Sequence, residues 1–402
     1  MANVSSSNGI EKQPKLRFPN FTEPYKLMEF SKYADVNPKC GKVPNSFYYI
    51  DLECVNAGEI KDLRIEMAET APSRAQRLLT LYDILFQTVR PYQKNNYHFK
   101  VENDLPTVAS TGYAVFRTEQ SSEYLYELIH TERFLSDIMK RCTGTSFPAV
   151  SSSDIEDIAI WIPGFQEQKK IGDFLTLVDT KIAKQRLLIE HLKKYKRGVV
   201  KTLLDPKQNQ RKGVIWTTDT IGKLGTFIKG AALSKADISD FGTPFVLYGE
   251  LYTTYKEVVR SIARTTQASV DDVYFSKVGD VVIPTSGETP EEISTASCIM
   301  VPNVILAGDL NIYRSTIVDG RIMSYLLNHI VNAQIARVAQ GKSVVHVQAS
   351  EVGKISITYP DHNEQERIAQ ILELIDNRIA VSEKALISMQ MMKKAFLQQL
   401  FI

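Results

Sequence analysis

Two stretches of the chain carry apolar residues at alternating steps of three and four positions. In the first they occupy positions 171, 175, 178, 182, 189, 192, 199 and 203, interrupted by Gln185 and Lys196. In the second they occupy positions 368, 372, 375, 379, 386, 389, 396 and 400, interrupted by Ser382 and Lys393. This heptad spacing predicts two amphipathic helices that pair along an apolar seam. The seam is expected to include Ile171, Leu175, Val178, Ile182, Ile189, Leu192, Ile368, Leu372, Ile375, Ile379, Leu386 and Met389.

Residues with strong end preferences delimit both helices. Asp361 and Glu364 have the spacing of a capping box, and Pro163 and Pro360 stand just before the two apolar patterns. An Asp-Pro pair at 205–206 ends the first helix. Each helix is therefore expected to span about 39 residues.

The polar interruptions favour an antiparallel pair. In that arrangement Gln185 is expected to face Lys393, and Lys196 to face Ser382. A parallel pair would instead bury Lys196 against Lys393, and two like charges in a seam repel strongly. We therefore expect antiparallel helices that carry the two preceding segments at opposite ends, related by a pseudo-twofold axis.

The chain also matches itself when it is shifted by 197 residues. The agreement is best in the helices, where residues 163–204 align with 360–401 without a gap. It extends upstream, since KLMEFSK at 26–32 meets KLGTFIK at 223–229, and Asp83, Arg117 and Ser146 recur as Asp280, Arg314 and Ser343. The whole module is therefore duplicated, with helices that stayed alike and upstream segments that diverged.

Each upstream segment, which we call a head, shows a mixed α/β pattern. Short apolar runs typical of strands occur at 47–52, 84–89, 113–117 and 158–162, and again near 244–249, 281–286, 310–314 and 355–359. A helix is expected at 123–141 in the first head and at 321–338 in the second. The predicted fold class is α+β, with two mixed α/β heads joined by an antiparallel coiled coil.

These patterns give the expected domain boundaries. They are a flexible N-terminal segment at 1–16, the first head at 17–162, a central helix at 163–206, a linker at 207–213, the second head at 214–359 and a C-terminal helix at 360–402.

Composition narrows the class of protein. With 402 residues, 44% hydrophobic and 23% charged, the chain has the composition of a globular protein. It contains no run of roughly 18 apolar residues and no signal-peptide pattern, so we expect no membrane partner and a cytoplasmic location. The four cysteines form no CxxC pair, and neither a zinc site nor a disulfide framework is expected.

The loops between the expected strands are rich in groups that bind nucleic acid. Arg, Asn and Gln can bond base edges, while Lys, Ser and Thr commonly contact phosphate. Positive charge also gathers at 180–212, where eleven Lys or Arg stand against Glu190 and Asp205. The candidate DNA contacts are Arg74, Arg77, Arg90, Lys94, Asn95, Asn96, Ser146, Arg260, Arg264, Thr285, Lys342 and Ser343.

No catalytic motif emerges from the sequence. The stretch AQGKSVV at 339–345 resembles the end of a phosphate-binding loop, but Ala336 replaces its first glycine and the strand-loop-helix context is missing. Motifs for nucleotide binding, zinc proteases, serine hydrolases and base methylation are absent, and the six histidines are scattered. We expect no catalytic residue, no metal site and no cofactor in this chain.

Taken together, these motifs resemble the specificity subunits of type I restriction-modification systems. The resemblance lies in PKLRFPNF at 14–21, in FPAV followed by DIAIWIPGFQEQKKI within 147–171, and in VVHV followed by KISITYPDHNEQERI within 344–368. A Pro-x-x-x-Glu-Gln-x-x-Ile helix start occurs twice at one period. Tyr25 stands where a tryptophan is common in the family.

The resemblance implies that each head is a target-recognition domain that reads one half of an asymmetric, interrupted duplex DNA site. The helices would set the gap and dock two methyltransferase subunits, and restriction-translocase subunits would join that core. S-adenosylmethionine, ATP and Mg²⁺ would belong to those partners. Two alternatives stay open at this point: a coiled-coil adaptor whose heads bind proteins, and the specificity component of a fused restriction-modification enzyme.

Overall fold

The computed structural model describes residues 13–209, 211, 213–341 and 345–402. The chain divides into two compact units. The first contains the residues up to Arg186 together with Lys384–Ile402, and the second contains Leu187–Glu383. Each unit therefore consists of one head and half of each long helix.

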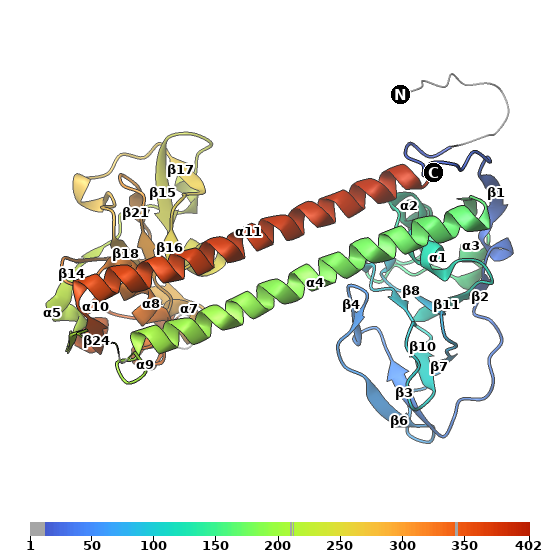
Figure 1. The fold of residues 1–402 in the computed structure, drawn as a ribbon, viewed down its shortest axis with the longest axis horizontal. Coiled ribbons are helices and arrows are strands. Elements are labelled where there is room, and N and C mark those ends of the chain that lie inside the picture. The colour runs from blue at the N-terminus through green and yellow to red at the C-terminus, as the bar shows by residue number, and fades with distance from the viewer. Residues whose placement is uncertain (1–12, 210, 212, 342–344) are drawn as a thin grey trace. The chain divides into compact units, whose positions relative to one another are not determined.

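The long helices are α4 (Phe165–Leu204) and α11 (His362–Leu400), close to the predicted lengths. In the first unit, Phe174 of α4 contacts Phe396 of α11 with 5.0 Å between ring centroids. In the second unit, Leu204 near the end of α4 shares a core with Ile368 near the start of α11. The beginning of one helix thus lies beside the end of the other in both units (Figure 1), which confirms the antiparallel prediction.

The predicted seam forms the contact face of both helices. All of its positions are buried or half-buried, including Ile171, Leu175 and Ile182 on α4 and Leu372 and Ile379 on α11. A heptad pattern places these side chains on one stripe, so their burial follows from the spacing itself.

The layers predicted for the two lysines need correction. Lys196 was expected to face Ser382, but its ammonium lies 2.6 Å from the Asp376 carboxylate. Lys393 was expected to face Gln185, but its ammonium lies 2.7 Å from the Asp179 carboxylate. A buried ammonium needs an opposite charge, which a serine hydroxyl or a glutamine amide cannot supply.

At the start of α11, only one of the two hydrogen bonds of the predicted capping box is formed. The Glu364 N–H donates to Asp361 Oδ1 at 3.2 Å, as in a capping box. The return bond is missing because the Asp361 N–H donates to the Ile215 carbonyl at 2.8 Å. The Glu364 carboxylate instead accepts from Asn209 at 2.9 Å, so the linker between the heads ties down this helix end.

The first head contains two four-stranded sheets, ordered β6-β3-β10-β7 and β2-β11-β8-β9, and two small ladders, β1-β12 and β4-β5. Its elements are β1 (Lys26–Glu29), η1 (Phe30–Lys32), β2 (Asp35–Val36), β3 (Ser46–Ile50), β4 (Val55–Asn56), β5 (Glu59–Ile60), β6 (Arg64–Met67), β7 (Ala75–Leu78), β8 (Ile84–Gln87), η2 (Pro91–Gln93), β9 (Tyr97–His98), β10 (Thr107–Ser110), β11 (Tyr113–Arg117), α1 (Ser122–Leu128), α2 (Glu132–Arg141), α3 (Ser152–Glu156) and β12 (Ala159–Ile162).

The second head contains a five-stranded sheet, β14-β22-β18-β20-β16, a three-stranded sheet, β17-β15-β21, and the ladders β13-β24 and β19-β23. Its elements are β13 (Trp216–Thr220), α5 (Ile221–Leu224), β14 (Gly225–Lys229), η3 (Lys235–Asp237), β15 (Thr243–Leu247), α6 (Glu250–Thr253), β16 (Val258–Val259), β17 (Arg264–Thr266), η4 (Asp272–Tyr274), β18 (Asp280–Pro284), β19 (Ser286–Gly287), α7 (Pro290–Ile293), β20 (Ser297–Ile299), β21 (Ile305–Ala307), β22 (Leu310–Ser315), α8 (Gly320–His329), α9 (Asn332–Val338), β23 (Val345–His346), α10 (Ala349–Lys354) and β24 (Ser356–Pro360).

The two heads share one core arrangement. In the first, β3 runs parallel to β10 and antiparallel to β6, and in the second β15 runs parallel to β21 and antiparallel to β17. Arg117 pairs with the buried Asp83 at 2.7 Å, and its repeat partner Arg314 pairs with Asp280 at 3.0 Å. The duplication read from the sequence is thus a duplication of structure, and each predicted strand overlaps an observed one.

Two details of the heads differ from the prediction. The helix expected at 123–141 is two helices, because the Thr131 hydroxyl accepts from the Phe134 N–H and starts α2 afresh. The helix expected at 321–338 likewise divides into α8 and α9. The segments at 26–32 and 223–229 also fold differently, since the first begins with β1 while the second forms the end of α5 and then β14.

Replacing Lys196 with methionine should destabilise the second unit strongly. The side chain is 8% exposed and lies 2.8 Å from Glu257 as well as 2.6 Å from Asp376. Methionine keeps the apolar stem but leaves two carboxylates without their cation, which costs about 3–5 kcal/mol. Chemical denaturation measures this loss. Lys256→Met, at an exposed pair with Glu383, is the matched control and should cost under about 1 kcal/mol. Equal losses in the two variants would contradict the assignment.

Candidate nucleic-acid interface

The loop after β8 lies beside a short hairpin, and between them they carry two of the predicted DNA contacts, Arg90 and Ser146. Beyond β8, the Arg90 N–H donates to the Pro148 carbonyl at 2.7 Å. Thr143 and Ala149 exchange two backbone bonds of 2.9 Å, which close a short hairpin beside the loop. The hairpin tip is exposed and carries Ser146.

The turn after Arg90 is rigidly held. Arg90 and Lys94 adopt left-handed φ angles of 55° and 54° on either side of the 3₁₀ turn at Pro91–Gln93. The buried Gln87 side chain supports this turn, donating to the Gln93 side chain and to the Val89 carbonyl at 2.8 Å each. A left-handed non-glycine residue costs of order 1 kcal/mol, and such strain is concentrated at functional sites.

Arg90 also stacks on an aromatic ring that the sequence prediction missed. Its guanidinium carbon lies 4.2 Å from the centroid of the Phe147 ring. Phe147 is 63% exposed, so one face of this pair is open to a ligand. The signal was present in the sequence as an aromatic residue beside Ser146 in a turn-forming stretch, but only the folded hairpin brings it to Arg90.

The other predicted contacts of the first head are placed differently. Asn96 is 1% exposed and its side chain accepts from the Gln87 N–H, so it belongs to the interior and not to the candidate interface. Asn95 accepts from the Ala57 N–H, and Lys94 pairs with Glu132 at 3.2 Å. Asn96 therefore supports the turn from the interior, whereas Lys94 and Asn95 are half-buried.

Arg74 and Arg77 lie apart from this turn. Arg74 is exposed just before β7, and Arg77 is half-buried within β7, at the edge of the first sheet. The structure therefore brings Arg90 and Ser146 together, whereas Arg77 lies in β7 of another sheet and Arg74 lies in the loop before it.

The second head has a short strand ladder at the equivalent position. Ser286 and Gly287 in β19 pair with His346 and Val345 in β23, and the Thr285 carbonyl accepts from the Val347 N–H at 3.0 Å. The predicted contacts Lys342 and Ser343 lie outside the described residues.

Both arginines predicted as contacts in the second head are engaged by carboxylates. Arg260 pairs with Glu373 at 2.8 Å, and Arg264 pairs with Glu250 at 3.1 Å. Each ion pair orients its arginine toward an acid of the same unit, so neither side chain gathers with Thr285.

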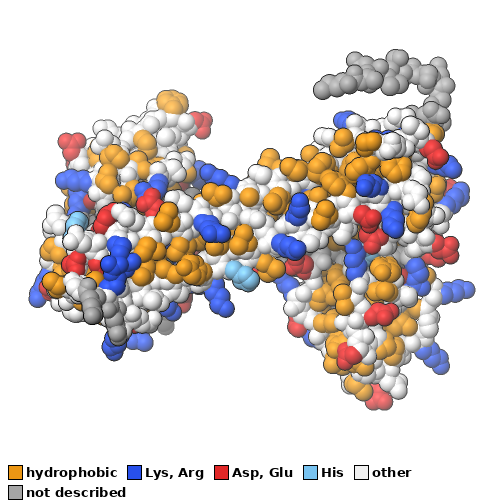
Figure 2. Space-filling view, in the orientation of Figure 1, with side chains coloured by type: hydrophobic (Ala, Val, Ile, Leu, Met, Phe, Trp, Pro, Cys, Tyr) orange, Lys and Arg blue, Asp and Glu red, His pale blue; other side chains and the backbone are white. Residues whose placement is uncertain are grey.

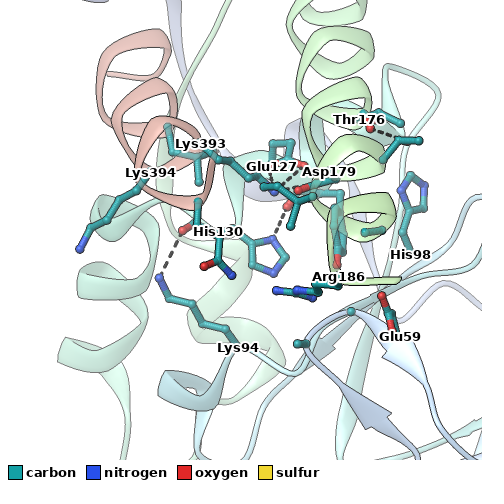
Figure 3. Close-up of a pocket in the computed structure, with 18 of the residues that line it drawn as sticks. Glu59, Lys94, His98, Glu127, His130, Thr176, Asp179, Arg186, Lys393 and Lys394 are labelled. Carbon is teal, nitrogen blue, oxygen red and sulfur yellow. Dashed lines mark hydrogen bonds and ion pairs between the residues drawn. The ribbon is translucent and has the colours of Figure 1, made fainter. Parts of the chain in front are cut away.

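A charged cavity of about 650 Å³ lies in the first unit between the head and the two helices. Figure 3 shows Lys393 of α11 directed at Glu127 of α1 and Asp179 of α4. Lys94 and Arg186 also line the cavity. Positive and negative groups are intermixed there, so the cavity does not favour an anion.

The second unit repeats this cluster at equivalent helix positions. Lys196 of α4 contacts Asp376 of α11 and Glu257 of the head, and His329 lies 2.7 Å from Glu257. Each unit thus joins the lysine of one helix to an aspartate of the other and a glutamate of the head.

The two glutamates of these clusters have opposite electrostatic surroundings. Burial raises the pKa of the Glu127 carboxyl to about 7, although Lys393 opposes the shift. Burial also acts on Glu257, but hydrogen bonds from His329 and Lys196 outweigh it and lower its pKa to about 2. In the same first unit, burial lowers the pKa of His98 to about 3 and that of His130 to about 4.

The described part of the chain shows no cluster of three or more His, Cys, Asp or Glu side chains able to hold a metal ion. Cys54 and Cys298 are buried, whereas Cys40 is exposed and Cys142 is half-buried, and none of them forms a disulfide. No described helix is long and apolar enough to cross a bilayer.

Comparison with known proteins identifies a family. The model of the type I restriction modification DNA specificity domain matches residues 83–193 and 214–389, well over half of the chain. The specificity subunit of the type I restriction enzyme HindI from Haemophilus influenzae is 28% identical over 146 residues. That match covers 33% of this chain and spans only 31% of the relative.

Two solved structures share the fold. The S subunit of a type I restriction-modification system from M. genitalium has a TM-score of 0.62 at 15% identity, covering 97% of this chain and 99% of that one. A chain from a study of complex assembly and conformational transition in a type I R-M system has a TM-score of 0.56 at 18% identity, covering 95% and 98%. At these identities the likeness concerns the fold alone.

Replacing Glu127 with glutamine should change the pH dependence of stability. Because the folded pKa of Glu127 lies near 7, above its ordinary 4.5, the native carboxyl binds its proton more tightly than the unfolded one. The tighter proton binding by Glu127 therefore stabilises the folded state fully below pH 4.5. This stabilisation is lost as the pH rises to about 7. Between pH 5 and pH 8, the free energy of unfolding of Glu127→Gln should therefore rise relative to that of the native chain by on the order of 2 kcal/mol.

Chemical denaturation at both pH values measures this difference. Glu132→Gln, which changes an exposed carboxylate paired with Lys94, is the matched control and should show no such gain. A pH-independent difference between Glu127→Gln and the native chain would contradict the raised pKa.

Proposed function

This chain belongs to the type I restriction modification DNA specificity family, and on that premise we propose that it selects the duplex DNA sequence on which such a complex acts. The observation that carries the proposal is a duplicated scaffold with two unlike loop sets. Arg90 and Phe147 of the first head correspond, at the 197-residue offset, to Gly287 and Val344 of the second. Two heads that share a core but differ in their loops are suited to read two different half-sites.

The chemistry of the loop supports nucleic acid as the ligand. Ser146 recurs as Ser343, and a hydroxyl common to both heads fits a contact with phosphate, which is the same in every sequence. Arg90 is particular to the first head, and an arginine can make a paired bond with guanine. Shared residues would position the heads, and differing residues would specify the bases.

The helix pair would serve as spacer and as docking surface for two methyltransferase subunits. Leu177 and its repeat partner Leu374 are 55% and 71% exposed, and Tyr195 and Met392 form a second exposed pair at equivalent positions. Hydrophobic side chains alternate with basic ones along the helices in Figure 2. Equivalent exposed apolar positions in the two units fit two copies of one partner.

In this proposal the chain is not itself the catalyst. Methyl transfer with S-adenosylmethionine and ATP- and Mg²⁺-dependent cleavage would belong to methyltransferase and restriction-translocase subunits. This chain would select the DNA sequence at which a cytoplasmic complex acts on double-stranded DNA.

Exchanging one head should change one half of the recognised site. If residues 17–162 are replaced by the corresponding head of another family member, the half-site read by the first head should change while the other half and the gap stay the same. Methylome sequencing of cells carrying the complete system measures this. A change in both halves would contradict the division of labour between the heads.

Lengthening both helices should lengthen the gap between the half-sites. One heptad adds about 10 Å of helix, which corresponds to about three base pairs of duplex. The same sequencing of methylated sites should show both half-sites unchanged and the spacing increased. Methylation at the original spacing would exclude the spacer role.

A further inference from the structure

We infer that Arg90, oriented by its stack on Phe147, reads a guanine in the half-site bound by the first head. This inference rests on the proposed function and names the residue pair that would carry part of the specificity. It starts from three observations at one turn: a strained backbone, an exposed aromatic ring and a stacked guanidinium.

The stack on Phe147 orients the guanidinium N–H groups of Arg90. A guanidinium that lies over an aromatic face keeps its N–H groups in its own plane, directed sideways and available to acceptors. The carbon-to-centroid distance of 4.2 Å places Arg90 in direct contact with the Phe147 ring. Paired N–H donors match the O6 and N7 acceptors of guanine in the major groove, the commonest specific arginine contact.

The backbone fixes where that guanidinium stands. Arg90 has a φ of 55°, and its N–H is bonded to the hairpin at Pro148. Pro91 restricts the next φ, and the Gln87 side chain bonds to Gln93 behind the turn. An arginine normally loses much rotamer freedom on binding, so a side chain already fixed by its surroundings binds at a lower entropic cost.

Comparison of the two heads distinguishes residues suited to contact phosphate in both half-sites from residues suited to read a base in one of them. Gly144 and Ser146 recur in the sequence as Gly341 and Ser343, as expected of residues with the same phosphate-contacting role in both half-sites. Arg90 does not recur, because Gly287 occupies its position in the second head. The left-handed φ of Arg90 would be easier for glycine, but the residue at this position of the first head is arginine. An arginine at a position that strains its own backbone fits a base-reading role.

Substituting Arg90 with glycine tests the inference. Glycine suits the left-handed φ, so the thermal stability should not fall, and the variant reproduces the residue of the second head. In cells carrying the complete restriction-modification system, methylome sequencing should show one guanine position of one half-site relaxed, with discrimination there reduced about 10- to 100-fold. The other half-site and the gap should remain unchanged.

Two further variants separate geometry from charge. Arg90→Lys keeps the charge but removes the paired donors, so it should relax the same position. Phe147→Leu keeps apolar volume but removes the ring, so it should relax that position less than Arg90→Gly. Arg133→Ala, at an exposed arginine of α2, is the charge-matched control and should leave the motif intact.

A phosphate contact would give a different result. Arg90→Gly would then weaken binding of the purified complex to all duplexes alike and reduce the salt dependence by about one ion, which would overturn the inference. An unchanged motif in Arg90→Gly would overturn it as well, while leaving the proposed function intact. If the native system itself methylates no two-part site, both the proposed function and this inference fail.

Discussion

The fold of each unit depends on neutralising one lysine within an apolar seam. Lys196 and Lys393 each lie between an aspartate of the opposite helix and a glutamate of the adjoining head. A buried ammonium requires a carboxylate beside it, because an unpaired buried charge is very costly. The contact therefore fixes helix against helix and head against helix pair at the same point.

The pairing of these two lysines with carboxylates limits which residues can differ between the two repeats. The residues that meet the two lysines tie three elements together, and the helix partners Asp179 and Asp376 are the same residue in both repeats. The head partners are more variable, since Glu127 comes from α1 while Glu257 precedes β16. Residues that do not contact the lysines, such as Arg90 and Phe147, are outside this constraint and differ between the repeats.

At the turn that begins with Arg90, buried side chains hold a surface loop in one conformation. Buried Gln87 and Asn96 support a turn that holds two left-handed residues, and the hairpin at 143–149 bonds to its first residue. Asn96, which the sequence predicted as a DNA contact, instead holds the turn in place from the interior. A fixed platform makes one or two exposed groups more selective than a larger set of mobile ones.

The sequence alone determined the features that repeat at short, regular spacing. Helix periodicity located α4, α11 and their buried seam, apolar runs located the strands, and the 197-residue offset revealed the duplication. Only the tertiary structure decided the contacts between distant residues: Lys196 with Asp376, Arg90 with Phe147, and Asn96 in the interior. The physical reason is that periodicity depends on backbone geometry within a few residues, whereas charge pairing and stacking depend on which distant segments meet.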